Sequence, residues 1–323
     1  MIVAINPEQR DAALARRTPE VEEVGSGVWS IPLPLPSRGG VESTLCYGIL
    51  DDSGGVTLID PGWDTPDNRD RIVDWLGRVG RRVGDIRVLA ATHFHPDHLG
   101  LAAALRDESG ARLVLGAADA ATVTHPLEPD DDAAFERWGV PGDERAELGS
   151  AAASRHGIDG FTADTGTDPI DVPGHPLVVI PTPGHTPGHL SFASPEDGLV
   201  FTGDHVLPII HPGLGLGGPQ DDPLGDYLAS LDALAPYDDA QVCPGHGYRF
   251  TGLAVRRREL AEHHLRRNAE IGRIRDALDE PTVWTVAQRV AWTDGWDGLR
   301  GFLRRSALAQ TEMHLRHLDR VAA

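Results

Sequence analysis

Lysine is absent from the 323-residue sequence, and only two cysteines are present, Cys46 and Cys243. Two cysteines so far apart cannot form the disulfide framework that stabilises small secreted domains. Thiols stay reduced in the cytosol by default, so we expect a cytoplasmic location. All 29 fixed side-chain cations are arginine. We attribute this to codon bias, because arginine outperforms lysine mainly at bidentate or stacked sites.

Long apolar segments are also missing from the sequence. No run approaches the roughly 20 apolar residues that cross a bilayer. Residues 1–17 mix charge with alanine and lack the apolar core of a secretory signal. We therefore expect neither a membrane span nor a membrane partner. The length and the hydrophobic fraction of 40% are typical of a globular protein with a large core.

Negative charge dominates the chain, whose formal net charge is -20. Such a charge opposes binding to nucleic acids and anionic membranes. Residues 253–323 differ, because they carry 13 Arg against 10 acidic residues, a balance of +3 that leaves -23 for the rest. This excess keeps a nucleic-acid partner conceivable but less favoured. We interpret the run Arg256–Arg258 as a solvated helix face.

The pattern of short apolar segments predicts strands and helices in alternation between a polar start and a helical end. We expect a loose arm over 1–20, a catalytic domain over 21–252 and a helical domain over 253–323. Residues 117–168 break the alternation and are interpreted as a mostly helical insertion that either covers the site as a lid or is a surface excursion. Strands are expected at 28–33, 43–50, 56–60, 86–92, 177–182, 189–193, 199–202 and 240–243, and helices at 68–79, 99–105 and 227–234, with the first three strands forming an antiparallel meander.

Four potential metal ligands occur within six residues after one of these strands. In an extended backbone His93, His95 and Asp97 project to one side. His98 reaches the same region if the chain turns at Pro96, where a helix is expected to begin. Imidazole nitrogens and a carboxylate suit Zn²⁺, Fe or Mn, so the cluster predicts a metal site.

Three later loops each place one ligand-type residue beside glycine at the end of a strand. They contain His185, Asp204 and His246. Small neighbours allow backbones to approach a shared centre. Loops that converge at strand ends are where α/β proteins build their sites, so we expect these residues to join the first cluster.

In this order of motifs the sequence resembles the metallo-β-lactamase superfamily. The resemblance rests on His-x-His-x-Asp-His, then Gly-His-Thr-Pro-Gly-His, Gly-Asp and Gly-His-Gly, and it covers residues 21–252. It implies an α+β fold, a four-layer αβ/βα sandwich of two mixed sheets with helices outside and the metal centre at one edge. Residues 253–323 resemble the small winged-helix-like domain of the β-lactamase-like-protein-2 branch.

The resemblance also implies two divalent metal ions, with zinc favoured over iron or manganese. His93, His95 and His185 correspond to the ligands of the first metal. The second metal corresponds to Asp97, His98 and His246, with Asp204 as the bridging carboxylate. Asp60 corresponds to a position that supports the ligand loop from behind.

A pair of metals would share a water, lower its pKa toward about 7 and deliver hydroxide to an electrophilic carbon or phosphorus. Asp97 could orient that hydroxide and move its proton. We therefore predict a dinuclear metal-dependent hydrolase that acts on a small-molecule ester, thioester or lactone, with likeness to the glyoxalase II branch. Two alternatives stay open, a metal-dependent ribonuclease of the same fold and a non-hydrolytic metal or diiron redox protein.

Overall fold

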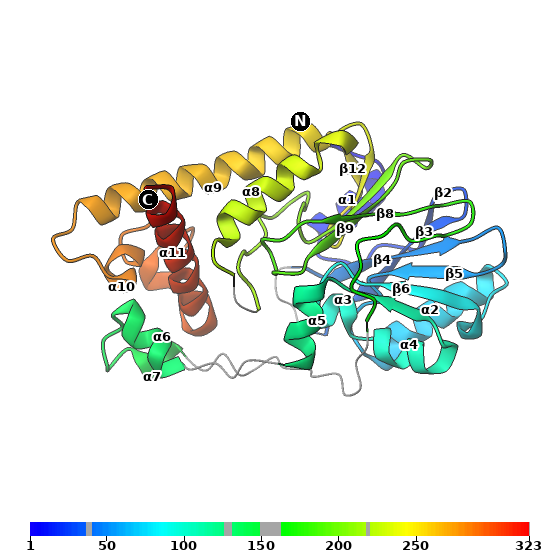
Figure 1. The fold of residues 1–323 in the computed structure, drawn as a ribbon, viewed down its shortest axis with the longest axis horizontal. Helices are drawn as coiled ribbons and strands as arrows, with labels where there is room; N and C mark the ends of the chain where they lie inside the picture. The colour runs from blue at the N-terminus through cyan, green and yellow to red at the C-terminus, as the bar shows by residue number, and fades with distance from the viewer. Residues whose placement is uncertain (37–40, 126–130, 149–162, 218–219, 323) are drawn as a thin grey trace.

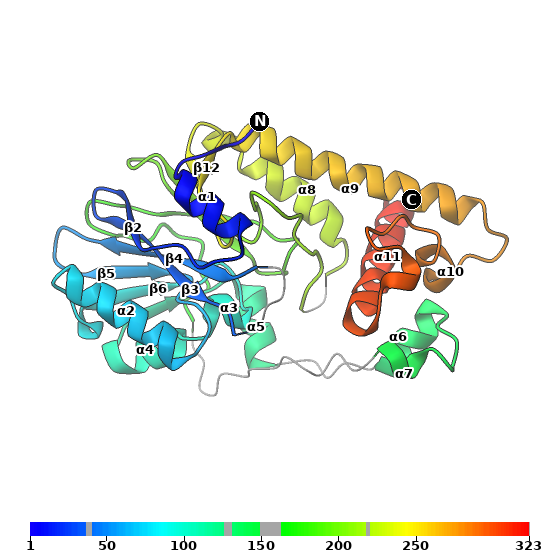
Figure 2. The ribbon, with the colours of Figure 1, turned by 180° about the vertical axis from the view of Figure 1, so that it is seen from behind.

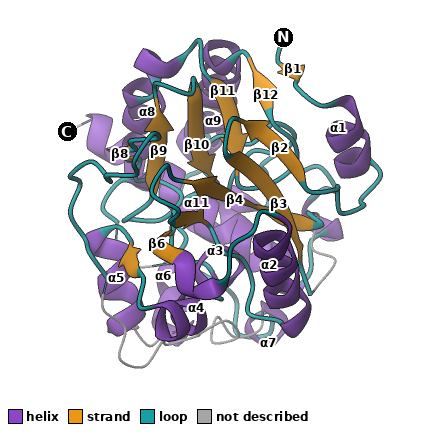
Figure 3. Ribbon diagram, turned by 90° about the vertical axis from the view of Figure 1, so that its right-hand side faces the viewer, coloured by secondary structure: helices purple, strands orange, loops and turns teal. Residues whose placement is uncertain are grey.

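Two six-stranded mixed sheets face each other at the centre of the molecule (Figures 1 and 3). The structure, a computed structural model, describes residues 1–36, 41–125, 131–148, 163–217 and 220–322. The first sheet has the order β2 (Glu22–Gly25), β3 (Val28–Pro34), β4 (Ser43–Leu50), β5 (Val56–Ile59), β6 (Ile86–Ala90) and β7 (Arg112–Val114). The second has the order β1 (Val3–Ala4), β12 (Phe250–Thr251), β11 (Gln241–Pro244), β10 (Leu199–Gly203), β9 (Leu190–Ser194) and β8 (Val178–Pro181).

The antiparallel meander predicted from the sequence is confirmed in the first sheet. Strands β2 to β5 pair antiparallel, and β5, β6 and β7 then pair parallel. In the second sheet only β10 and β11 pair parallel. The parallel strands of both sheets end at the same edge of the sandwich, where the loops with the candidate ligands begin.

Apolar side chains fill the space between the two sheets. Leu45, Tyr47 and Ile49 alternate along β4 and pack against Phe192 of β9 and Phe201 of β10. The alternation follows from the two-residue period of a strand, which sends every second side chain to the same face. These side chains are at most 2% exposed, so they form the inner core.

Helices cover the outer face of each sheet (Figures 1 and 2). On the first sheet, α2 (Pro66–Arg78) buries Ile72, Trp75 and Leu76, the face predicted from the sequence. On the second sheet, α8 (Pro223–Ala233) and the long α9 (Leu253–Asp276) cover Val200 and Val242. The layer order helix, sheet, sheet, helix confirms the predicted four-layer sandwich.

The other helices are α1 (Pro7–Leu14), α3 (Pro96–Leu99), α4 (Ala102–Ser109), α5 (Ala117–Thr124), α6 (Asp131–Trp138), α7 (Arg145–Leu148), α10 (Val283–Ala287) and α11 (Gly301–Ala322), and short 3₁₀ turns lie at Val83–Asp85, Ala235–Tyr237 and Trp296–Gly298.

The N-terminal segment differs from the loose arm that we expected. Strand β1 pairs with β12, and α1 begins after Asn6, whose side chain accepts hydrogen bonds from the first helical turn. Gln9 is buried and its side-chain oxygen accepts from the backbone N–H of Arg249 at 2.8 Å. The strand pairing and this hydrogen bond attach the segment to the second sheet, contacts between distant parts of the chain that local patterns do not reveal.

The C-terminal residues 253–322 form helices, as predicted, and the described residues there include no strand. The likeness to a winged helix therefore stays unconfirmed. None of the helices in the described ranges has the combination of length and apolar character that crossing a bilayer requires.

The predicted insertion contributes helices to two different places. Helix α5 lies beside the sandwich, whereas α6 and α7 lie under α10 and α11 (Figure 1). Phe135, Trp138 and Leu148 pack there against Trp284 and Leu308. A lid role for this segment stays a prediction, and its part at 149–162 lies outside the described residues.

The arginine run in α9 is not the solvated face that we expected. Arg256 is buried and donates to two backbone carbonyls, and Arg257 pairs with Asp238 at 2.9 Å. Only Arg258 has its side chain on the exposed surface. Residues distant in sequence supply the acceptors, so the run itself could not indicate burial.

Arg304 of α11 joins the C-terminal helices to α7. Its guanidinium is 8% exposed and lies 3.2 Å from a carboxylate oxygen of Glu144 and 2.9 Å from one of Glu147. We expect Arg304→Met to lower the free energy of unfolding by about 2 kcal/mol, because the ionised hydrogen bonds are lost while the glutamates retain access to water. Urea unfolding measures the change. Arg316→Met on the same helix removes an exposed pair and should cost less than about 0.5 kcal/mol; equal losses would contradict the prediction.

Candidate metal centre

All seven predicted ligands meet at the strand-end edge of the sandwich. His93 and His95 follow β6, and Pro96 begins α3, which carries Asp97 and His98. The other three come from the loops after β8, β10 and β11 and are His185, Asp204 and His246. Their side-chain ligand atoms form three groups in which the atoms lie within 4.8 Å of one another.

One group consists of three imidazoles. His95 Nδ1 lies 2.8 Å from His93 Nε2 and 3.2 Å from His185 Nε2. The turn at Pro96 lets His95 present its Nδ1 where the other two rings present Nε2. The convergence of three ring nitrogens on one point is the arrangement that a single metal ion needs.

A second group lies beside the first and contains one carboxylate. His246 Nε2 lies 3.2 Å from His98 Nε2 and 3.3 Å from Asp97 Oδ2. The Asp97 side chain is 19% exposed, more than the imidazoles around it, so it faces the opening of the centre.

Asp204 touches both groups. Its Oδ1 lies 3.3 Å from His246 Nε2 and 3.5 Å from His98 Nε2, and its Oδ2 lies 3.7 Å from His185 Nε2. A single carboxylate with one oxygen toward each group has the geometry of a bridge between two cations.

In His98, His185 and His246, the ring nitrogen that does not face the centre has a fixed hydrogen-bond acceptor. His98 Nδ1 donates to Asp60 Oδ2 at 2.9 Å. His185 Nδ1 donates to the carbonyl of Gly213 at 2.6 Å, and His246 Nδ1 donates to the carbonyl of Ser43 at 2.9 Å. These bonds place the proton on Nδ1, so each Nε2 presents a lone pair to the centre.

The donor set fits a cation. The Nε2 atoms of His98 and His246 and the buried Asp204 Oδ1 lie within 3.5 Å of one another. Burial alone would lower the pKa of His246, but Asp204 and Asp97 raise it well above its ordinary value. Burial opposes ionisation of Asp204 as well, yet His246 and His98 lower its pKa. The pocket therefore stabilises positive charge at its middle.

Asp60 orients the rings of His98 and His93 by hydrogen bonds on the side that faces away from the centre. Its Oδ2 accepts from His98 and from Thr92 Oγ1, at 2.9 Å each, while Oδ1 accepts from Thr92 N at 2.7 Å. Thr92 Oγ1 in turn accepts from His93 Nδ1 at 3.1 Å. Asp60 has a φ of +54°, a conformation unfavourable for residues other than glycine, so the fold holds this carboxylate in place at a cost in backbone strain.

Asp119 of α5 was not found by sequence reasoning. Its carboxylate accepts hydrogen bonds from Phe94 N at 3.1 Å, Thr186 Oγ1 at 2.7 Å and Gly188 N at 2.6 Å, and thus joins two ligand loops. Burial raises its pKa to about 6, against the effect of the three donors. The residue stands in an alanine-rich stretch that we assigned to the insertion, and nothing in the local pattern marks it.

Two glycines permit this joining of the loops. A Cβ on Gly116 would lie 1.8 Å from the carbonyl oxygen of Gly188, and one on Gly188 would lie 2.4 Å from Asp119 N. Only residues without side chains allow the start of α5 to reach the loop of His185.

Two mixed sheets between helices, with imidazoles and carboxylates converging at one edge, define the class of metal-dependent hydrolases. Residues 39–246 match the sequence pattern of the metallo-beta-lactamase superfamily. The chain therefore belongs to this superfamily.

Individual relatives extend the match to most of the chain. It is 26% identical over 298 residues to the beta-lactamase-like protein 2 homolog of Caenorhabditis elegans, covering 92% of this chain and 86% of that one. It is 35% identical over 218 residues to the hydroxyacylglutathione hydrolase of Cereibacter sphaeroides, covering 68% of each. The crystal structure of a metallo-beta-lactamase family protein from Thermus thermophilus superposes with a TM-score of 0.72 at 27% identity, covering 93% of this chain and 96% of that one.

We expect Asp60→Asn to weaken metal affinity by about 10- to 100-fold, because the amide cannot accept from both Thr92 and His98 with full charge. Asparagine tolerates a positive φ, so the backbone strain should not change. Metal titration with a competing chelator measures the affinity. The matched control is Asp197→Asn, which alters an aspartate–histidine pair at 2.8 Å away from the centre. Equal metal affinities of the wild type, Asp60→Asn and Asp197→Asn would contradict the role of Asp60.

We expect Asp119→Asn to loosen both ligand loops, because an amide NH₂ would oppose one of the three donors that the carboxylate now accepts from. Metal affinity should fall about tenfold or more. Asp51→Asn is the control, since Asp51 accepts in the same way from Ser53 N and Gly55 N in a loop away from the centre. Competition titration compares the two, and a larger effect from Asp51→Asn would refute the assignment.

Proposed function

We propose that this chain is a hydrolase that holds two divalent metal ions and cleaves a small-molecule ester, thioester or lactone. The observation that carries the proposal is the meeting of two groups of ligand atoms that share one carboxylate, Asp204. The membership of the superfamily and the hydroxyacylglutathione hydrolases among its relatives support it.

In the proposed centre His93, His95 and His185 hold one ion, and Asp97, His98 and His246 hold the other, with Asp204 between them. Nitrogen and oxygen donors without a cysteine suit zinc, and they also suit iron or manganese. Both cysteines are buried in the cores of the sandwich, and neither belongs to the groups of ligand atoms found among the described residues.

When bound, the metal ions would supply Lewis acidity toward a carbonyl oxygen and toward water. The chain's own residues then orient the reactants. Asp97, which is the accessible carboxylate of the set, would accept a hydrogen bond from the attacking water and take up its proton. Burial opposes ionisation of Asp97, but His98 and His246 lower its pKa, so the carboxylate stays ionised and can accept a hydrogen bond from the water.

A small-molecule substrate is favoured over nucleic acid by the net charge of the chain and by the engagement of three arginines of the C-terminal helices. The arginine excess there was the feature that suggested RNA. In the structure Arg256, Arg257 and Arg304 are engaged by carbonyls and carboxylates of the chain itself. They are not available to phosphates, while the net charge of -20 opposes the approach of a polyanion.

We expect metal-free protein to be inactive and to regain thioester or ester hydrolysis on addition of zinc, manganese or iron(II). Asp97→Asn should lower kcat by about 100-fold or more, whereas Asp74→Asn on the exposed face of α2 should not. Steady-state assays on an acyl-glutathione, an aryl ester, a lactone and labelled single-stranded RNA measure the outcome. Cleavage of RNA alone, or hydrolysis that survives metal removal, would reject the proposal.

A further inference from the structure

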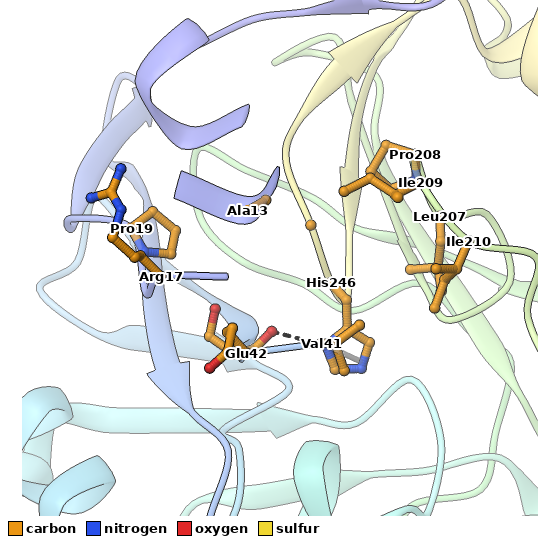
Figure 4. A pocket seen from close by; sticks show the side chains of 12 residues that line it. Ala13, Arg17, Pro19, Val41, Glu42, Leu207, Pro208, Ile209, Ile210 and His246 are labelled. Carbon is orange, nitrogen blue, oxygen red and sulfur yellow. Dashed lines mark hydrogen bonds between the residues drawn. The ribbon is translucent and has the colours of Figure 1, made fainter. Parts of the chain in front are cut away.

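A pocket opens directly beside the candidate ligand His246 (Figure 4). Its cavity volume is about 40 Å³, and it is continuous with the open solvent around it. Its walls come from four parts of the chain: the end of α1 with the residues after it, the residues that lead into β4, the loop after β10, and the loop after β11 that carries His246. The lining residues with apolar side chains are Ala13, Pro19, Val41, Leu207, Pro208, Ile209 and Ile210.

The apolar side chains of this pocket are unusual in their exposure. Ile209 and Ile210 are 43% and 40% exposed, although isoleucine is among the residues most often buried in proteins. Adjacent exposed aliphatic side chains that face a hollow are typical of a binding surface. A ligand with an apolar part would remove them from water.

A buried arginine holds the wall that carries these isoleucines. Arg256 Nε donates to the carbonyl of Leu207 at 2.7 Å, and its Nη2 donates to the carbonyl of Ile210 at 2.9 Å. The residue is only 6% exposed. Burial of a guanidinium is costly unless it is hydrogen-bonded, and here its bonds fix the loop at both ends. The wall is therefore formed before any ligand arrives.

The opposite wall is fixed through the N-terminal segment. Helix α1 is attached by the pairing of β1 with β12 and by the bond from Arg249 N to Gln9. This places Ala13 against the pocket with a side chain of one carbon. A larger side chain at that position would occupy the space.

We infer that this pocket binds the first carbons of an uncharged aliphatic acyl chain, with the acyl carbonyl next to His246. The inference rests on the proposed function, and it names the acyl part of the substrate. Hydrolysis would break the bond from the acyl carbon to sulfur or oxygen, add water, and release a carboxylic acid with a thiol or an alcohol. Arg17 and Glu42 are the charged residues among those that line the pocket; their charges are opposite, so together they give no net charge that would select a charged acyl chain.

The test compares hydrolysis of acetyl, butyryl, hexanoyl and octanoyl thioesters of one thiol by the metal-loaded enzyme. We expect kcat/KM to rise about two- to fourfold for each methylene up to hexanoyl, the gain given by partial to full burial of the added group. Ala13→Trp, which fills the pocket, should lower the hexanoyl-to-acetyl ratio of kcat/KM at least tenfold. Leu14→Trp is the matched control, because Leu14 is 61% exposed on the same helix and does not line the pocket.

A second variant shows whether a lost preference comes from misfolding of Ala13→Trp. A binding measurement tests the pocket independently of hydrolysis. Ile210→Asp changes an exposed side chain and should reduce the same ratio even if Ala13→Trp does not fold. Calorimetry with octanamide, an uncharged probe, and metal-free protein should show binding to the wild type and to Leu14→Trp, and a loss of affinity in Ala13→Trp.

Each outcome decides one of the two proposals. Hydrolysis with a flat chain-length profile, or with a profile unchanged in both pocket variants, would overturn the acyl pocket and leave the proposed function intact. Octanamide binding that is lost in Ala13→Trp, together with no thioester or ester hydrolysis by loaded enzyme, would overturn the proposed function while the selectivity of the pocket stands. Neither binding nor hydrolysis would overturn both.

Discussion

The carboxylate of Asp60 is the group on which the metal centre depends. It lies at the end of β5 in a backbone conformation that side chains rarely adopt, and it receives three hydrogen bonds from the neighbouring ligand segment. Through these bonds it sets the orientation of His98 directly and that of His93 through Thr92. A change at Asp60 would therefore reach both groups of ligand atoms at once, although Asp60 itself is not among the proposed ligands.

The ligand loops are held from two sides. Asp60 acts from within the first sheet, and Asp119 acts from α5, where its carboxylate joins the loop of His95 to the loop of His185. Each acidic side chain accepts several backbone or side-chain donors, so each fixes more than one segment. Rigid support of this kind reduces the reorganisation needed when a cation binds, because the imidazoles already converge.

Contacts within the molecule engage several of the arginines that make the C-terminal helices positively charged. The C-terminal helices have an excess of arginine, and the acidic segment that contains α6 and α7 packs against them. Arg304 meets Glu144 and Glu147 there, while Arg256 supports the wall of the pocket beside the metal centre. Part of the positive charge at the end of the chain is thus used for packing between elements, while other arginines there, such as Arg273 and Arg289, are exposed.

The sequence by itself determined the fold class, most strands of the two sheets and the ligand-type residues, because strand periodicity and dense histidine motifs are local properties of the chain. Tertiary structure alone decided which residues support those motifs. Asp119, Arg256 and the attachment of β1 are visible only after distant segments are brought together. Their partners lie between 25 residues away, for Asp119 and Phe94, and 248 residues away, for Val3 and Thr251. A side chain's hydrogen-bond partners across the fold leave no local signal, so patterns along the sequence cannot reveal them.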